Sequence, residues 1–173
     1  IVLAGTFNPV HAGHVKCVQD ARAFLEASTT YTVVAGLLSP ASDARTSRKF
    51  KRLGKGRPML LTTRVMACEM ATSHLPWLGV LSAEAAEICA SCVDSTEAVR
   101  RAADLALQGG ATAVAFQITT SESVDSYGGW DGIVQWEAEE LTKTPERVFP
   151  KRLVMVRPGS SLPPGEPPEG WHA

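Results

Sequence analysis

One stretch of the chain decides the fold: Gly5-Thr6-Phe7-Asn8-Pro9-Val10-His11-Ala12-Gly13-His14. It follows an apolar opening, Ile1–Ala4, which predicts a buried strand, and it leads into a helical pattern that begins near Val15. A glycine-containing turn between a strand and a helix presents backbone N–H groups and the positive end of the helix dipole, and both attract phosphate. We therefore expect an anion-binding turn here.

Two histidines, His11 and His14, stand three residues apart in this turn and can point into the same anion site. An imidazole there can donate hydrogen bonds to phosphate oxygens as negative charge builds up during phosphoryl or nucleotidyl transfer. The alternative is two surface histidines at a helix N-terminus, which is the better interpretation of an arbitrary His-x-x-His pair. The strand before the turn and the helix after it favour the phosphate site.

Apolar runs alternate with helical patterns along the rest of the chain. The sequence predicts strands over 1–4, 31–38, 77–81, 111–118 and 152–157. Helices are predicted from Val15 onward and over 60–73, 83–107 and 131–141. This order is typical of an α/β fold, a Rossmann-like doubly wound parallel sheet with five strands in the order 3-2-1-4-5. Such sheets bind ligands at the carboxyl edge beside strand one, where the Gly5–His14 turn lies.

Helical spacing predicts which side chains of the first two helices face the core. In the first helix these residues are Val15, Val18, Ala21 and Leu25. In the second helix they are Val65, Met66, Met70 and Ala71.

The composition is that of an ordinary globular protein, with 173 residues, 45% hydrophobic residues and a formal net charge of −1. No apolar run reaches the roughly 20 residues of a membrane span, and nothing resembles a signal peptide. The chain begins at Ile1, on what should be the first core strand, so we expect a processed or partial chain. The expected location is intracellular, either cytoplasmic, nuclear or mitochondrial.

Four cysteines argue against a disulfide framework. Cys89 and Cys92 form a C-x-x-C, but no second pair with zinc spacing follows. Both fall in a helical pattern of small apolar residues. We expect buried thiols rather than zinc or redox chemistry, and no metal site.

The segment Ala44–Pro58 holds seven of the seventeen Lys and Arg residues and no acid. One interpretation is a solvated loop. The other is a loop that overhangs the phosphate site, or that contacts the acidic surface of a protein partner or a nucleic acid. Phe50 is the only aromatic residue among these charges, so nucleic acid is the least favoured partner.

The C-terminal segment 158–173 is rich in proline and glycine and cannot form a helix or an interior strand. We expect one domain over 1–157, with a basic loop at 44–58, followed by an extended arm over 158–173. The arm should be ordered only against a protein partner.

These motifs resemble a known family. Gly5-Thr6-Phe7-Asn8-Pro9 with His11-Ala12-Gly13-His14 is similar to the signature of the nucleotidyltransferase superfamily, which has an [HT]-x-G-H motif on a Rossmann-like sheet. Members use ATP or CTP and release pyrophosphate. Ser39-Pro40-Ala41-Ser42-Asp43-Ala44 and the helix around Thr63–Thr72 narrow the resemblance to eukaryotic nicotinamide mononucleotide adenylyltransferases. It covers residues 1–80 well and 111–157 weakly.

The resemblance implies a set of site residues and substrates. Catalytic donors to the phosphates would be His11 and His14. The nucleotide would be bound by Gly5, Thr6, Phe7, Gly13, Arg45, Arg48, Lys49 and Trp130. The substrates would be ATP and a nicotinamide or nicotinate mononucleotide, and Mg²⁺ would arrive bound to ATP.

The chain also departs from the family pattern. After the fifth strand, the family has an Ile-Ser-x-Thr-x-x-Arg motif that holds the ATP phosphates, whereas this chain continues into its proline-rich segment. The tryptophan that stacks on the nicotinamide ring falls near Ala83, and the family's Gly-Ala-Asp element corresponds roughly to Thr120-Ser121-Glu122. Trp130 keeps the position of a later family tryptophan.

Two hypotheses about function follow. In the first, the chain transfers AMP from ATP to a pyridine mononucleotide and releases NAD and pyrophosphate. In the second, it is a catalytically degenerate relative, a structural subunit of a larger assembly such as a mitochondrial complex, attached through its arm. The intact first motif favours the enzyme, while the departures favour the subunit and predict a poor adenylyltransferase.

Overall fold

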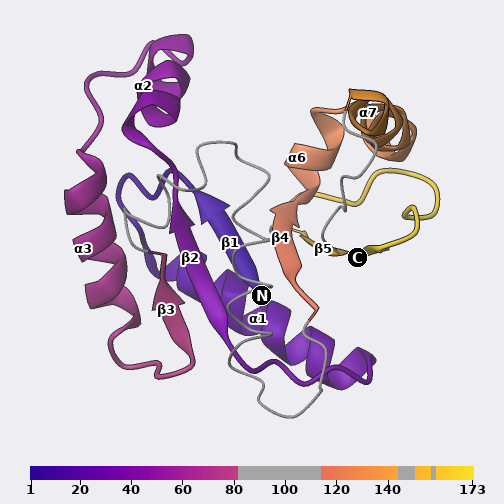
Figure 1. Cartoon of the computed structure of the whole chain (residues 1–173), viewed down its shortest axis with the longest axis horizontal. Helices are drawn as coiled ribbons and strands as arrows, with labels where there is room; N and C mark the ends of the chain where they lie inside the picture. Colours follow the sequence, from indigo (N-terminus) through magenta and orange to yellow (C-terminus); the bar gives the residue numbers. More distant parts are fainter. Residues whose placement is uncertain (82–113, 144–150, 157–158) are drawn as a thin grey trace. The chain divides into compact units, whose positions relative to one another are not determined.

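The computed structural model describes residues 1–81, 114–143, 151–156 and 159–173 (Figure 1). The chain divides into two units, Ile1–Ala115 and Phe116–Ala173. The helix predicted over 83–107, with the Cys89–Cys92 pair, lies outside the described residues.

The first unit contains three parallel strands. Strand β1 (Val2–Gly5) pairs with β2 (Gly36–Pro40), which pairs on its other side with β3 (Leu78–Val80). Strand two was expected to begin at residue 31, but residues 31–35 are not in a strand and Val34 is 59% exposed. Strand β1 is only four residues long, and its backbone pairs with residues 37–40. The earlier residues of the apolar run that begins at residue 31 therefore have no partner in β1.

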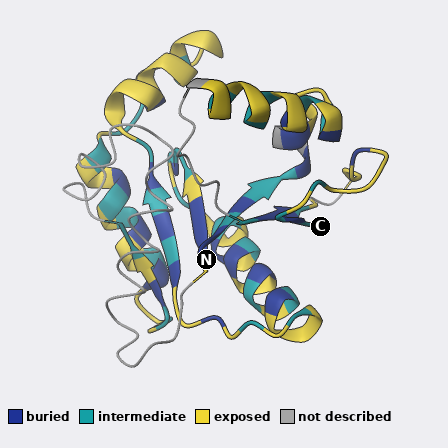
Figure 2. Cartoon of the chain, turned by 45° about the vertical axis from the view of Figure 1, so that its right-hand side comes forward, coloured by how far each residue is buried: buried dark blue, intermediate teal, exposed yellow. Residues whose placement is uncertain are grey.

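Helix α1 (Ala12–Ser28) connects β1 to β2. It begins before the expected start at Val15 and therefore includes His14 in its first turn. Its buried residues form one stripe and are the four that the spacing predicted: Val15, Val18, Ala21 and Leu25 (Figure 2).

Helix α2 (Asp43–Arg52) replaces most of the basic loop expected over 44–58. The Ser42 side chain caps it by accepting a hydrogen bond from the Arg45 backbone nitrogen at 3.3 Å. Asp43 lies in the first turn and three cations lie in the last, which matches the helix dipole at both ends. The helix was missed because only Thr46 in it is buried, so there is no apolar stripe to indicate it.

Helix α3 (Leu61–Thr72) was expected at almost this position, but its inward face was predicted wrongly. The residues expected to face the core are exposed or half-buried, with Met66 61% and Met70 76% exposed. The buried residues are Arg64, Cys68 and Thr72. Helices α1 and α3 contact each other, because successive right-handed crossovers place both on one face of the sheet.

The second unit also has parallel strands joined by helices. Strand β4 (Phe116–Thr120) is followed by α6 (Ser121–Asp125) and α7 (Gly129–Lys143), and β5 (Lys151–Met155) pairs with β4. A further short strand, β6 (Trp171–His172), pairs with β5. The six strands have the order β3-β2-β1-β4-β5-β6, so the expected Rossmann-like parallel sheet is present with six strands in place of five.

The C-terminal segment packs within its own unit, which corrects the expectation of an arm ordered only against a partner. Trp171 belongs to the core cluster of this unit, together with Trp130, Ile133 and Val154. The Trp130 indole N–H donates to the Pro163 carbonyl at 3.2 Å. The prolines still exclude a helix and an interior strand. They do not exclude β6, which is a two-residue strand at the edge of the sheet.

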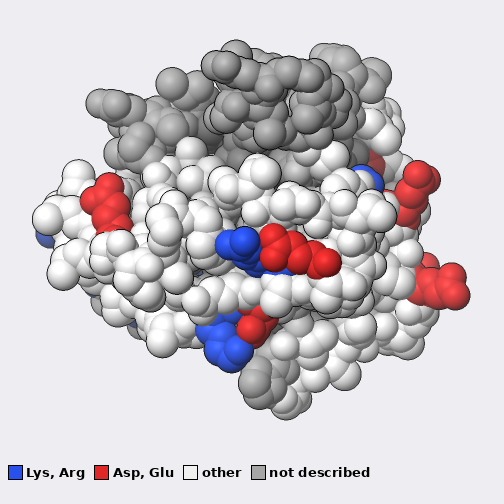
Figure 3. All heavy atoms as spheres, turned by 90° about the horizontal axis from the view of Figure 1, so that it is seen from below, with Lys and Arg blue, Asp and Glu red and all other residues white. Residues whose placement is uncertain are grey.

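Charged side chains of both signs lie beside one another on the face shown in Figure 3. Helix α1 carries two exposed ion pairs of the i,i+4 type, Lys16–Asp20 at 2.8 Å and Arg22–Glu26 at 3.2 Å. Among the residues that the structure describes, no helix has the length and apolar character needed to cross a membrane.

Candidate functional site

The Gly5–His14 turn lies at the carboxyl end of β1, beside the end of β2. Gly5 is in register with Pro40, and the Gly5 carbonyl accepts a hydrogen bond from the Ala41 nitrogen at 2.8 Å. The connection to α1 and the connection to α2 therefore begin at the same edge of the sheet. This is the edge at which parallel α/β sheets place their ligands.

Phe7 shapes the turn from inside. It is the only non-glycine residue with positive φ among the described residues, at 42°, and it is 1% exposed. Its ring crowds position 5, since a Cβ on Gly5 would lie 3.1 Å from two ring carbons and the ring would have to move by a few tenths of an ångström. The ring edge also meets His14, with centroids 5.0 Å apart. Phe7, expected to bind nucleotide, thus supports the turn from the core.

The two histidines of the motif lie together. Their ring centroids are 3.8 Å apart and the planes are tilted by 31°. The His11 backbone N–H donates to His14 Nδ1 at 3.2 Å. Because Nδ1 accepts, the proton of the neutral His14 ring is on Nε2, which is therefore a donor.

Gly13 allows this stacking. A Cβ at position 13 would lie 3.1 Å from two atoms of the His11 ring, Cε1 and Nδ1. The glycine between the two histidines therefore gives the His11 ring the space that it occupies beside the helix start. The start of α1 adds the positive end of the helix dipole at the same place, while the His14 backbone N–H itself donates to the His11 carbonyl at 2.9 Å.

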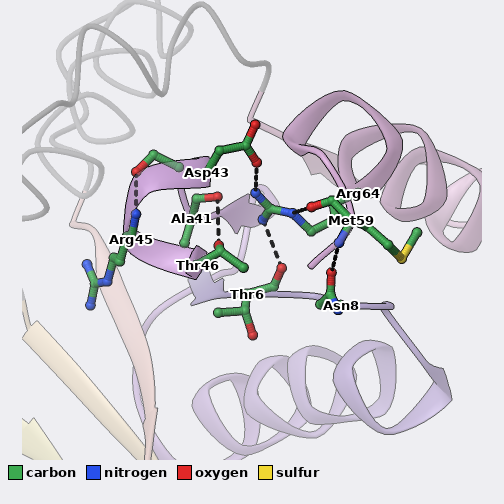
Figure 4. Close-up of polar contacts among 9 residues, drawn as sticks. Thr6, Asn8, Ala41, Asp43, Arg45, Thr46, Met59 and Arg64 are labelled. Atoms are coloured by element: carbon green, nitrogen blue, oxygen red, sulfur yellow. Dashed lines mark hydrogen bonds and ion pairs between the residues drawn. The ribbon is translucent and has the colours of Figure 1, made fainter. Parts of the chain in front are cut away.

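An unexpected residue, Arg64, ties this turn to its neighbours (Figure 4). Its side chain is fully buried, and it donates to the Thr6 carbonyl at 2.9 Å and to Asp43 Oδ1 at 2.8 Å. Nε donates to the Met59 carbonyl at 3.1 Å. Arg64 is not among the predicted site residues, because an arginine in a helix is most often a surface residue. The pattern that could have indicated its burial is its position one helical turn before Cys68, on the same face of α3.

The predicted cations of α2 lie on the surface. Arg45, Arg48 and Lys49 are exposed, and no hydrogen bond or ion pair within the described residues joins their side chains to the turn. Figure 4 shows the Arg45 side chain running away from the Arg64 contacts. The buried side of α2 is held instead by Thr46, whose hydroxyl lies 3.5 Å from the Ala41 carbonyl.

Trp130, the remaining predicted ligand residue, is 5% exposed in the core of the second unit. Its ring meets Trp171 edge-on, with centroids 5.9 Å apart, and its N–H is bound to Pro163. The ring and the donor are thus both engaged in packing.

Cys68 is an inert core thiol. It is fully buried, and burial raises its pKa to about 11 although the nearby Arg64 charge acts in the opposite direction. A thiol with that pKa is protonated at neutral pH and is neither a nucleophile nor a metal ligand. Across the described parts of the chain, no group of three or more His, Cys, Asp and Glu is placed to hold a metal ion.

Comparison with known proteins gives relatives for the same region. The chain is 26% identical over 80 residues to nicotinamide/nicotinic acid mononucleotide adenylyltransferase 2 of Rattus norvegicus, and the match covers 46% of this chain and 24% of the relative. The protein of the same name from Danio rerio is 27% identical over 82 residues, again with 24% of its length covered. The chain thus matches about a quarter of the length of these relatives.

A family match agrees with the turn and the sheet. Residues 2–90, just over half of the chain, match the cytidylyltransferase-like family, and this range contains β1, the motif turn, α2 and Arg64. The chain belongs to the cytidylyltransferase-like family of nucleotidyltransferases.

Proposed function

We propose that this chain transfers AMP from ATP to a pyridine mononucleotide. The phosphate oxygen of the mononucleotide attacks the α-phosphorus of ATP, the bond from that phosphorus to the bridging oxygen breaks, and pyrophosphate leaves with the electron pair. The products are the dinucleotide and pyrophosphate. The choice of ATP and a pyridine mononucleotide is supported by the name of the relatives that match residues of the same region.

The observation that carries the proposal is the hydrogen bond from the His11 N–H to His14 Nδ1. It leaves the proton of the neutral His14 ring on Nε2, which is then a donor at the start of α1, the positive end of the helix dipole. Donors gathered at one point stabilise the charge that develops on phosphate oxygens when the α-phosphorus is attacked. No protein nucleophile is required, so alignment and charge stabilisation are the roles left to the protein.

The other residues of the turn have supporting roles in this proposal. His11 adds a second donor next to His14, and Gly13 keeps the helix start open for it. Mg²⁺ arrives with the triphosphate, because Mg²⁺ is commonly held through substrate phosphates rather than by a protein cage. The exposed cations of α2 attract the negatively charged nucleotide as it approaches.

The test is pyrophosphate release by the chain with ATP and nicotinamide mononucleotide, compared with His14→Ala and His11→Ala. Loss of a charge-stabilising donor costs about 10²–10³ in rate, so we expect His14→Ala to release pyrophosphate more slowly than the wild type by that factor. His11→Ala should fall less, because His11 lies on the exposed side of the stacked pair.

Two controls separate the alternatives. In the first, CTP replaces ATP, and a faster reaction with CTP would mean that CTP is the substrate. ATP binding without turnover by the wild-type chain would favour the degenerate relative. Equal rates for the wild type and His14→Ala would reject the site.

A further inference from the structure

Arg64 is buried in α3, yet each of its three nitrogens donates to a different segment of the first unit. Nη1 donates to the Thr6 carbonyl, Nη2 to Asp43 and Nε to the Met59 carbonyl. An uncompensated buried charge is very unfavourable, so a fully buried guanidinium is stable only when its partners stay in place. The three contacts therefore constrain one another.

The Thr6 contact lies next to the strained part of the motif turn. Thr6 directly precedes Phe7, whose φ of 42° is costly for a residue with a side chain. On the other side of Phe7, Asn8 Oδ1 accepts a hydrogen bond from the Met59 nitrogen at 2.7 Å. Both neighbours of the strained residue are thus tied to the segment 59–64 (Figure 4).

The Asp43 contact connects the same arginine to α2. Asp43 is the first residue of this helix, and its side chain is 49% exposed while that of Arg64 is 0% exposed. One buried cation thus joins the turn that follows β1 to the helix that follows β2. The two connections that start at the carboxyl edge of the sheet cannot move independently while this pair is formed.

We propose that Arg64 is a positioning residue for the phosphate site. Through the Thr6 carbonyl and Asp43 it holds the motif turn in its strained shape and fixes α2 beside it, and so sets nucleotide affinity without touching the nucleotide. This inference rests on the proposed function in naming a nucleotide as the ligand. Its claim about the turn itself does not.

The experiment compares the wild type with Arg64→Lys and Asp43→Asn. Arg64→Lys keeps the charge but replaces a three-way fork by a point donor, and Asp43→Asn removes the charge of an exposed partner while the arginine stays. Asp20→Asn, which changes a carboxylate in the exposed Lys16–Asp20 pair, is the matched control. Amide hydrogen exchange of residues 5–14 and ATP affinity by calorimetry are measured for each variant.

We expect exchange over residues 5–14 to rise about tenfold or more in Arg64→Lys, the effect of losing one charge-assisted hydrogen bond. Exchange in the second half of α1 should stay at the wild-type rate. ATP affinity should fall by about tenfold or more in Arg64→Lys and by less in Asp43→Asn. Asp20→Asn should change neither quantity.

The outcomes separate this inference from the proposed function. Lower global stability with unchanged exchange in the turn would overturn the inference, because Arg64 would then be an ordinary core residue. Faster exchange with unchanged ATP affinity would overturn its link to the nucleotide. If the wild type binds no ATP while exchange in the turn still rises, the positioning role stands and the proposed function fails. Should Arg64→Lys not fold, Asp43→Asn decides by the same two readouts.

Discussion

Two glycines of the motif turn leave room for aromatic rings that the sequence places nearby. Gly5 makes space for Phe7, and Gly13 makes space for His11, in each case with ring atoms 3.1 Å from where a Cβ would be. Neither glycine has a positive φ, so space rather than backbone conformation is the reason for both. Gly5 and Gly13 thus make room for the chain's own rings, and their contact with a nucleotide stays a prediction.

Gly13→Ala should separate function from stability. Alanine within a helix stabilises by roughly 0.5–1 kcal/mol relative to glycine, so the free energy of unfolding should hold or rise. The new methyl group would lie 3.1 Å from the His11 ring and should shift it, so we expect ATP affinity to fall by up to about tenfold, the value of one hydrogen bond to a charged group.

The control for this change is Gly56→Ala. A Cβ at Gly56 meets nothing within 4 Å, so both stability and ATP affinity should remain close to wild type. Urea unfolding and calorimetric titration measure the two quantities. Full ATP affinity in Gly13→Ala would mean that the stacked arrangement of His11 is not part of the site.

Among the elements, α2 is held by its N-terminal end and by one buried residue. Ser42 caps its start, Asp43 is bound to Arg64, and Thr46 packs beneath it. Ser42→Ala should lower the free energy of unfolding by about 1 kcal/mol, because a cap residue satisfies one of the orphan N–H groups of the first turn.

Ser47→Ala is the matched control in the same helix. Ser47 is exposed in the helix interior, where alanine has the higher helix propensity, so this change should be neutral or slightly stabilising. Urea unfolding of both variants measures the difference. Equal stabilities for the two would show that the Ser42 cap does not support α2.

The sequence predicts those features of the helices and strands that depend on neighbouring residues along the chain. The stripe of α1 was predicted residue by residue, since its apolar spacing alone determines its buried face. The buried face of α3 was not predicted, because the partners of Arg64 lie 58 and 21 residues away along the chain. The spacing of residues within the helix does not indicate such distant partners. In the same way, β6 depends on pairing with β5 and could not be recognised from a proline-rich segment.

At the scale of the whole molecule, the C-terminal segment is part of the second unit. Trp171 is 8% exposed, its N–H donates to Glu137 at 3.2 Å, and the Arg152 guanidinium lies 4.7 Å from the centroid of its ring. Trp171→Ala should therefore destabilise this unit by about 3–5 kcal/mol, the cost of truncating a buried tryptophan.

Amide hydrogen exchange of β4 and β5 would report this loss. Leu162→Ala, at a residue of the same segment that is 40% exposed, is the control and should cost far less. Unchanged protection of β4 and β5 in Trp171→Ala would mean that the segment is only loosely placed on its unit.

In the proposed function, the motif turn binds nucleotide phosphate through His14. The most direct measurement is ¹⁵N NMR of the histidine side chains during titration with Mg-ATP. We expect a shift at Nε2 of His14, with Nδ1 remaining an acceptor, and no change at the exposed His74. If saturating Mg-ATP leaves the His14 ring unchanged, or shifts His74 equally, the turn is not the nucleotide site.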